Sequence, residues 1–138
     1  MQTLHFAASV QHQISLLVSG NPLTAFDRYF AQNGVMFANG TIFASSAAEA
    51  RAKQKPFFDS ACEIHGCISD LAFDLRKQLC AFRNRTLFVS SDSVSHQIDG
   101  LCWQYWQDGK IAIERYYDGD FMREQIERGI LTKPALLL

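Results

Sequence analysis

The sequence predicts an α+β domain in which helices cover one face of a curved antiparallel sheet. Two observations support this class. Apolar residues recur at helical spacing through about residue 55, and from Glu63 onward they alternate with a period of two. Three helices therefore precede a run of strands, and such segregation is typical of α+β domains. The 138 residues are enough for one such domain, which we expect to span residues 1–138.

Two helices are expected at the start of the chain. Apolar side chains three and four positions apart predict a helix over residues 3–18, and Gly20 ends it. Asn21 and Pro22 begin a second helix, because asparagine caps free amides and proline needs no hydrogen bond at the first position. We expect this second helix to end at Asn33.

A short strand and a third helix follow. Residues 35–38 are an apolar run with turn signals on both sides, which predicts a buried strand. Ser46 and Glu49 have the spacing of a capping box, in which each side chain satisfies a free backbone amide. We expect the helix that they begin to end near Lys55, because Pro56 follows.

The second half of the chain predicts a sheet. Strands are expected at residues 63–74, 79–89, 94–106 and 111–118. Asp108 and Gly109 lie between the last two strands, and this dipeptide is a strong hairpin signal. Asp120 is expected to cap a short final helix that Gly129 ends.

Composition excludes several classes of partner. Thirteen Lys and Arg against fourteen Asp and Glu give a net charge of −1, so we expect neither nucleic acid nor a membrane as a partner. The sequence shows no apolar run long enough to span a bilayer and no secretory signal, which favours the cytoplasm. The four cysteines are expected to be reduced and buried, since their spacing with His65 suits zinc poorly. We expect no metal and no cofactor.

Alternation divides strand 79–89 into two faces. One face carries more apolar surface, and we expect it to point inward; its residues are Phe82, Asn84, Thr86 and Phe88. Arg83 and Arg85 then point outward, either as surface charges or as a site for an anionic ligand. Asp99 either balances these arginines or, under the other parity, faces the interior.

The strand at residues 94–106 carries large aromatic side chains on both faces. Cys102 and Trp106 share one face, and Trp103 and Tyr105 share the other. A sheet with one buried face alternates apolar and polar residues, so two aromatic faces suggest that both are covered. We expect a homodimer through the outer sheet face. The alternatives are that Trp103 and Tyr105 form a surface patch or recruit a different protein.

The order of these elements resembles the nuclear-transport-factor-two-like (NTF2-like) superfamily, and within it the SnoaL-like branch. The resemblance covers residues 3–128 and is carried by Asn21-Pro22, Tyr29-Phe30, Val35-Met36-Phe37, Trp106-Gln107-Asp108-Gly109-Lys110-Ile111 and the strand that ends at Asp118. It implies a cystatin-like cone: three N-terminal helices packed on a strongly curved, mainly antiparallel sheet, a pocket between them, and a short C-terminal helix. Relatives include ketosteroid isomerases, polyketide cyclases and dehydratases, which use no cofactor, and modules that only bind or assemble.

The residue pattern of the ketosteroid isomerases is not matched. Their general base is an Asp at the end of the first strand, where this chain has Ala38 and Asn39. Their neutral, hydrogen-bond-donating Asp falls at Cys102 or Leu101, and neither residue can serve. We therefore do not expect steroid isomerisation by that mechanism.

The resemblance places Glu114 in the pocket. A carboxyl group in apolar surroundings has a raised pKa, which suits a general acid or base. We expect Glu114 and His96 to be the catalytic residues, with His96 as the proton-sharing partner. The alternatives are a surface or buried Glu114 paired with an arginine, and a His96 that merely packs at the edge or in the core.

A small-molecule ligand is expected in the apolar pocket. Its contacts are predicted to be Tyr29, Asn84, Phe82, Phe88, Cys102, Trp106 and Tyr116. Tyr29 and Tyr116 either donate hydrogen bonds to a ligand carbonyl or are only packing aromatics. The function expected is a cofactor-free isomerase, cyclase or dehydratase acting on a cyclic or aromatic substrate, or else a non-enzymatic binding or assembly module of the same fold.

Overall fold

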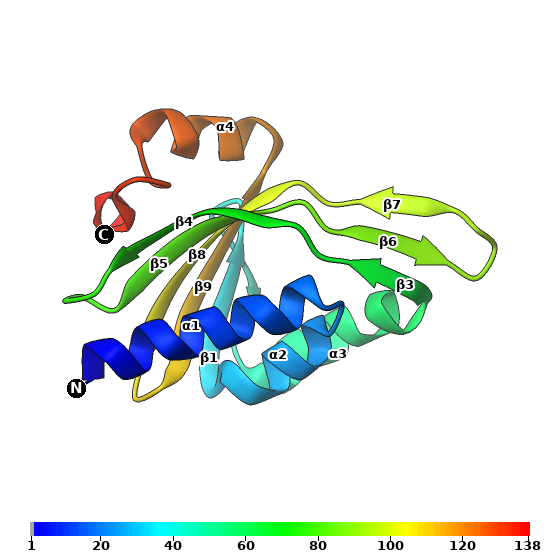
Figure 1. Cartoon of the computed structure of the whole chain (residues 1–138), viewed down its shortest axis with the longest axis horizontal. Helices are drawn as coiled ribbons and strands as arrows, with labels where there is room; N and C mark the ends of the chain where they lie inside the picture. The colour runs from blue at the N-terminus through cyan, green and yellow to red at the C-terminus, as the bar shows by residue number, and fades with distance from the viewer. Residues whose placement is uncertain (1) are drawn as a thin grey trace.

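The computed structural model describes residues 2–138, with side chains from His5 onward. The helices are α1 (Gln2–Val18), α2 (Pro22–Tyr29), α3 (Ala47–Asp59), α4 (Gly119–Arg128) and a 3₁₀ turn, η1 (Pro134–Leu137). The strands are β1 (Phe30–Ala38), β2 (Thr41–Ala44), β3 (Ala61–His65), β4 (Ile68–Asp74), β5 (Leu79–Asn84), β6 (Leu87–Ser90), β7 (Ser95–Gln97), β8 (Gly100–Gln107) and β9 (Lys110–Asp118). The α+β class is therefore confirmed (Figure 1).

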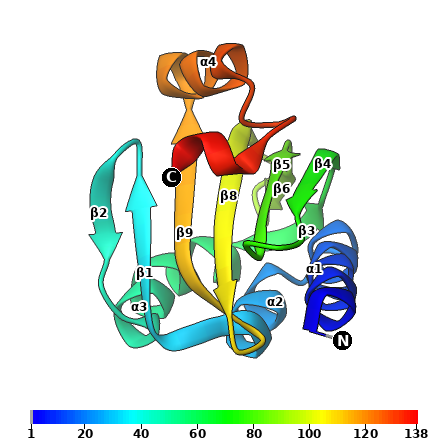
Figure 2. The same cartoon turned by 90° about the vertical axis from the view of Figure 1, so that its left-hand side faces the viewer.

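The strands form two connected sheets. The larger has the order β2-β1-β9-β8-β5-β4, and all its neighbours are antiparallel except β1 and β9, which are parallel. The smaller has the order β3-β6-β7. Helices α1, α2 and α3 lie on one side of the larger sheet, and α4 and η1 lie on the other (Figures 1 and 2). Mainly antiparallel strands with three N-terminal helices on one face are what the sequence predicted.

Three of the predicted long strands are each broken in the middle. Gly66 and Cys67 separate β3 from β4, and similar short breaks separate β5 from β6 and β7 from β8. A Cβ on Gly66 would lie 2.1 Å from the carbonyl oxygen of Leu17, so only glycine lets the end of α1 approach this point. The outer halves of the broken strands form the smaller sheet, which extends away from the body of the domain (Figure 1). The strands change direction at these breaks, and the two sheets together form a concave face under the helices (Figure 1).

Two predicted helix ends are wrong. Helix α2 ends at Tyr29 rather than Asn33, because Phe30 is extended and already pairs with Ile111 of β9. Helix α3 continues to Asp59, past Pro56. A proline this close to the C-terminal end removes only one backbone donor, and the carbonyl oxygen of Pro56 still accepts a bond from the N–H of Ser60.

Helix α4 begins earlier than expected. Asp118, rather than Asp120, is the N-cap residue, and its side chain makes no cap bond. Instead, Asn39 Nδ2 donates to Asp118 Oδ1 at 2.8 Å, which ties the end of β9 to the β1–β2 turn. Gly129 ends α4 in the left-handed conformation with φ of 93°, as predicted.

The outer face of the sheet is covered by the chain's own C-terminal segment. Leu101 and Trp103 of β8 pack with Met122 of α4 and with Ile130, and Trp103 is only 2% exposed. Helix α4 and the tail cover Trp103 on this face, so the two aromatic faces of β8 need no second subunit (Figure 2). Trp103 is not a surface patch either, and its burial is no argument for a dimer.

Candidate functional site

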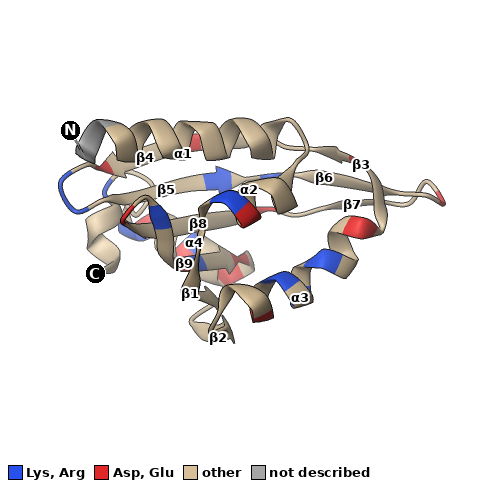
Figure 3. Ribbon diagram, turned by 90° about the horizontal axis from the view of Figure 1, so that it is seen from below, with Lys and Arg blue, Asp and Glu red and all other residues tan. Residues whose placement is uncertain are grey.

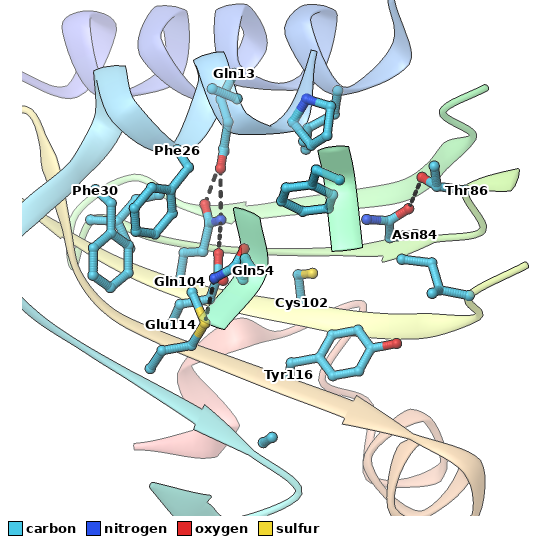
Figure 4. Close-up of a pocket in the computed structure, with 18 of the residues that line it drawn as sticks. Gln13, Phe26, Phe30, Gln54, Asn84, Thr86, Cys102, Gln104, Glu114 and Tyr116 are labelled. Carbon is cyan, nitrogen blue, oxygen red and sulfur yellow. Dashed lines mark hydrogen bonds between the residues drawn. The ribbon is translucent and has the colours of Figure 1, made fainter. Parts of the chain in front are cut away.

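A cavity of about 360 Å³ lies between the three N-terminal helices and the concave face of the sheet (Figure 4). Its wall is largely apolar and includes seven phenylalanines: Phe26, Phe30, Phe37, Phe43, Phe58, Phe82 and Phe88. The polar side chains in the wall are Gln13, Gln54, Asn84, Thr86, Gln104, Glu114 and Tyr116. No Lys or Arg is among the described residues that line it. The cavity therefore suits an uncharged, mainly apolar molecule.

Strand register explains which side chains face the cavity. Gln104 of β8 pairs with Glu114 of β9, and two residues further along Cys102 pairs with Tyr116. Phe82 of β5 pairs in turn with Cys102. Directly opposite residues share a face, so all of these side chains lie on the concave side. The inward orientation predicted for strand 79–89 is confirmed, since its four inward residues all line the cavity.

Glu114 lies in the cavity wall and is half-buried. Its Oε1 accepts a hydrogen bond of 2.7 Å from Nε2 of Gln104 (Figure 4). Burial raises the pKa of Glu114 above its ordinary value of 4.5, and the bond from Gln104 offsets only part of this effect. The carboxyl group therefore holds its proton to a higher pH than a solvated glutamate does.

A buried polar network supports Glu114 from behind. Gln104 and Gln13 exchange two hydrogen bonds, of 2.8 Å and 3.0 Å, between their side-chain amides. The indole Nε1 of Trp106 donates to Gln104 Oε1 at 3.0 Å, and the thiol of Cys80 donates to the same oxygen at 3.4 Å. Together with the bond to Glu114, these bonds join α1 to β5, β8 and β9. Both the nitrogen and the oxygen of the Gln104 amide are therefore held by hydrogen bonds.

A second polar group lies further along the same wall. Thr86 donates to Oδ1 of Asn84, which leaves the amide N–H groups of Asn84 free to donate to a ligand (Figure 4). Tyr116 stands two residues from Glu114 on β9, about 7 Å at the usual strand rise. Burial is the main reason that the pKa of Tyr116 is raised, so its hydroxyl is a neutral donor.

Gly100 makes room for Tyr116. A Cβ at this position would lie 2.2 Å from a ring carbon of Tyr116. The absence of a side chain at Gly100 thus lets the phenol ring approach the backbone of β8 closely. The position of this ring at the cavity wall depends on a glycine that sequence reasoning did not assign to the site.

Three of the predicted site residues lie outside the cavity. His96 is exposed on β7, and its ring contacts Phe57 with centroids 5.7 Å apart. It pairs with Phe88, so the predicted face was right, but β7 is the outer strand of the smaller sheet and lies away from Glu114. The expected partnership of His96 with Glu114 is therefore not part of the site's geometry, because His96 does not line the cavity.

Tyr29 and Trp106 are also outside the cavity wall. The hydroxyl of Tyr29 forms a hydrogen bond of 2.5 Å with Nδ1 of His12, and its ring packs against Trp106. Phe6 covers Trp106 from α1, with ring centroids 5.9 Å apart. Trp106 thus reaches the site only through its bond to Gln104. The remaining predicted contacts, Asn84, Phe82, Phe88, Cys102 and Tyr116, all line the cavity.

The outward arginines form an ion pair. Nε and Nη2 of Arg83 donate to Oδ1 and Oδ2 of Asp99, each at 3.0 Å. Nε of Arg85 lies 3.6 Å from Oδ1 of the same carboxylate. The hydrogen bond from Arg83 is the main reason that the pKa of Asp99 is lowered. The prediction that Asp99 balances these arginines is confirmed, and Asp99 does not line the cavity. Figure 3 marks the positions of the Lys, Arg, Asp and Glu residues along the helices and strands.

Sequence reasoning did not assign Gln13 and Gln104 to the site. Both carried a weak signal, since each is a polar residue on an otherwise apolar stripe, Gln13 three residues after Val10 and Gln104 between Cys102 and Trp106. Their partnership spans 91 positions and had no local signature. Among the described residues, no three His, Cys, Asp or Glu side chains gather as metal ligands. None of the helices described has the length and apolarity required to cross a bilayer.

Solved structures share this fold. No family model and no curated protein sequence matches the chain. A candidate SnoaL-like polyketide cyclase from Mesorhizobium loti matches with a TM-score of 0.65 at 18% identity, covering 81% of this chain and 97% of its own. An NTF2-like protein of unknown function from Exiguobacterium matches with a TM-score of 0.63 at 17% identity, covering 81% and 98%.

A third solved structure with this fold is described as a cystatin-fold protein. A cystatin-fold protein from Novosphingobium aromaticivorans matches with a TM-score of 0.62 at 14% identity, covering 84% of this chain and 97% of its own. At these identities the likeness concerns the fold, which is also what the element order of the sequence indicated. The chain therefore has the NTF2-like, cystatin-type fold that these structures share.

Proposed function

We propose that the protein binds an uncharged cyclic or aromatic small molecule in the cavity and acts on it by proton transfer through Glu114, without a cofactor. One observation carries this proposal. A carboxyl group with a raised pKa stands in the wall of an apolar cavity, held by a neutral amide rather than by a cation. Reactions of the isomerase, cyclase and dehydratase type need such a group.

The wall of the cavity favours aromatic or cyclic ligands. Phenylalanine rings contact flat, apolar molecules with specific stacked or edge-on geometries. A volume of about 360 Å³ is at the lower end of the range for small-molecule sites. The absence of Lys and Arg from its described lining disfavours an anionic ligand. The candidate polyketide cyclase among the structural neighbours is consistent with a ligand of this class.

The proposed chemistry conserves protons. Neutral Glu114 gives its proton to a carbonyl or hydroxyl oxygen of the ligand, and the carboxylate that remains accepts the N–H of Gln104. The carboxylate then takes a proton from a neighbouring carbon of the same ligand, which shifts a double bond or completes the loss of water. Asn84 and Tyr116 can donate to a second ligand oxygen about 7 Å away along β9. Glu114 ends the cycle protonated.

A second candidate function is binding without turnover. The observation that favours it is that Glu114 is the only Asp, Glu or His among the described lining residues, so no second carboxyl or imidazole group faces the ligand. In that case, Glu114 is a hydrogen-bond donor that recognises the ligand and returns unchanged. Both candidates share the cavity and differ only in whether a proton moves.

The experiment that separates these candidates uses deuterium exchange. The purified protein is mixed in D₂O with a panel of uncharged bicyclic and tricyclic ketones, and NMR follows both binding and the exchange of C–H protons. Proton transfer predicts exchange that Glu114→Gln abolishes while binding persists. Binding alone predicts shifts of ligand signals with no exchange. Cys102→Leu, which narrows the cavity, is expected to weaken binding, and undiminished exchange in Glu114→Gln would contradict the proton-transfer proposal.

Location and assembly complete the proposal. Free cysteines, two of them exposed, suit a reducing cytoplasm. A homodimer would use the part of the outer sheet face that α4 and η1 leave open, at β1 and β2 (Figure 2). Ile42 of β2 is 60% exposed there. Light scattering on a size-exclusion column tests the dimer, since it predicts twice the monomer mass of 15.6 kDa and Ile42→Glu should return the monomer value.

A further inference from the structure

Gln104 has an unusual position for a glutamine. It lies in the middle of β8, is 1% exposed, and has hydrogen bonds at both its amide nitrogen and its amide oxygen. Burial of an amide without hydrogen-bond partners costs free energy, but both the nitrogen and the oxygen of this amide have partners. Gln104 connects Trp106 and Gln13 to Glu114. The orientation of its amide therefore decides whether the carboxyl group of Glu114 contacts the amide nitrogen or the amide oxygen.

Trp106 determines the direction of that amide. An indole N–H can only donate, so the Gln104 atom 3.0 Å from it must be the oxygen. The nitrogen of Gln104 is then on the opposite side, facing Gln13 and Glu114. Gln13 follows the same order, because its oxygen accepts from Gln104 and its nitrogen donates back. Along the path from Trp106 through Gln104 to Glu114, each donor therefore points toward Glu114.

This direction leaves the two oxygens of Glu114 inequivalent. Oε1 accepts from Gln104, and a proton on Oε1 would face the amide hydrogens, so the proton of the neutral acid belongs on Oε2. Oε2 has no hydrogen bond to a described residue. Among those residues, Arg115 Nε is the only fully buried side-chain polar atom that lacks a hydrogen-bond partner. Oε2 of Glu114 also lacks a partner, so it is not fully buried and is accessible from the cavity that Glu114 lines.

We infer that Gln104 is a positioning residue: oriented by Trp106, it holds Oε1 of Glu114 so that the proton-carrying Oε2 is the oxygen presented to the ligand. The role rests on the proposed function of Glu114, because a positioned proton matters only if the ligand uses it. It adds a requirement that the cavity alone does not impose. The neutral acid must act through one oxygen, and that oxygen is selected by an indole that never touches the ligand.

Infrared spectroscopy of the protein without ligand tests this role. The carbonyl band of protonated Glu114 is identified as the band that Glu114→Gln removes, and it is followed as the pH is raised. In Gln104→Met, which keeps side-chain length, the band is expected at higher frequency because its oxygen no longer accepts a bond. The pH at which the band disappears is expected to rise, since the amide bond favours the charged form.

A second variant covers the case in which Gln104→Met does not fold. Trp106→Phe keeps the ring contacts with Phe6 and Tyr29 but loses the N–H donor, so the amide of Gln104 can turn. A shifted or split Glu114 band is expected. Gln54→Met is the matched control, because Gln54 lines the same cavity but donates to Met36 Sδ at 3.3 Å rather than to Glu114. Its Glu114 band should not move.

The outcomes distinguish this inference from the proposed function. An unchanged Glu114 band and titration in folded Gln104→Met, or in Trp106→Phe where the first variant does not fold, would overturn the positioning role even if ketones exchange protons. Equal shifts in the Gln54→Met control would overturn it too, since they would show a general response of the cavity. The band shifts expected for Gln104 and Trp106, found together with no ligand binding, would support the positioning geometry while the proposed function failed.

Discussion

The indole Nε1 of Trp103 donates a hydrogen bond of 2.8 Å to the carbonyl oxygen of Pro134, which joins the outer face of the sheet to the last turn of the chain. Trp103 is 2% exposed and packs in one cluster with Leu101 and Ile130. Because the tail covers this face, β8 can carry large aromatic side chains on both faces within one chain. The bond also satisfies the one polar atom that the buried indole has.

Replacement of Trp103 tests how much this contact contributes. Trp103→Phe should lower the free energy of unfolding by about 1–3 kcal/mol, through one lost hydrogen bond and a smaller ring. Urea denaturation followed by circular dichroism measures the change. Removal of residues 134–138 should cost more and should uncover the face, so the shortened protein is expected to self-associate on a size-exclusion column. A shortened chain as stable and as monodisperse as the full chain would show that the tail is not a structural cover.

Much of the fold was predictable because its signals are local. The period-two pattern of strand 79–89 placed Phe82 and Asn84 inward, and Asp108 with Gly109 gave the β8–β9 hairpin. What the sequence could not show were effects of tertiary packing. The break at Gly66 exists because α1 crosses there, and α3 passes Pro56 where the next turn packs its phenylalanines against Phe88.

The site was predictable only in part, for the same physical reason. Glu114 lines the cavity as the resemblance implied, and Tyr116 lines it too, since alternation along one strand puts both side chains on the same face. His96 lies on the predicted face, but on β7 of the smaller sheet and not beside Glu114. Alternation gives the face of a side chain, but it does not show where a strand breaks and its outer half leaves the site. The partnership of Gln13 with Gln104 requires α1 to lie across β8, which no local pattern encodes.

Glu114 is expected to make stability depend on pH. Its pKa is raised in the folded state, so the folded protein binds this proton more tightly than the unfolded chain. The resulting stabilisation is complete below the unfolded value of about 4.5 and is lost as the pH rises through the folded pKa. Glu114→Gln, which cannot ionise, should remove this part of the pH dependence.

Denaturation curves of both proteins between pH 4 and pH 9 check this expectation. The difference in unfolding free energy, wild type minus Glu114→Gln, should fall as the pH rises. A difference that stays constant would mean that folding leaves the pKa of Glu114 unshifted, and a difference that grows with pH would mean that folding lowers it. Glu124→Gln, which removes an exposed carboxyl group on α4, serves as the control.

Asp99 is expected to act in the opposite direction. Its pKa is lowered, mainly by the hydrogen bond from Arg83, so its contribution to stability is present above the unfolded value of 3.8 and is lost as the pH falls. The pair is partly exposed, so the effect of Asp99→Asn should be below about 1 kcal/mol and should shrink in high salt. The difference between wild type and Asp99→Asn should disappear at acid pH; a difference that persists there would point to packing rather than charge.

Gly100 is expected to be sensitive because of one contact, not because of its backbone. Its φ lies outside the left-handed region, so an alanine can adopt the conformation, but the added Cβ would lie 2.2 Å from the ring of Tyr116. Gly100→Ala should therefore destabilise the protein by about 1–3 kcal/mol as the ring is pushed from its place. It should also weaken ligand binding, because Tyr116 would move within the cavity wall.

A double-mutant cycle isolates this contact. In a Tyr116→Ala background the ring is absent, so Gly100→Ala should be neutral or slightly stabilising, since alanine loses less conformational freedom than glycine on folding. The coupling between the two changes, measured by urea denaturation of all four proteins, should then be at least about 1 kcal/mol. Equal costs of Gly100→Ala in both backgrounds would place the clash on another group, and Tyr116 would no longer explain why β8 begins with a glycine.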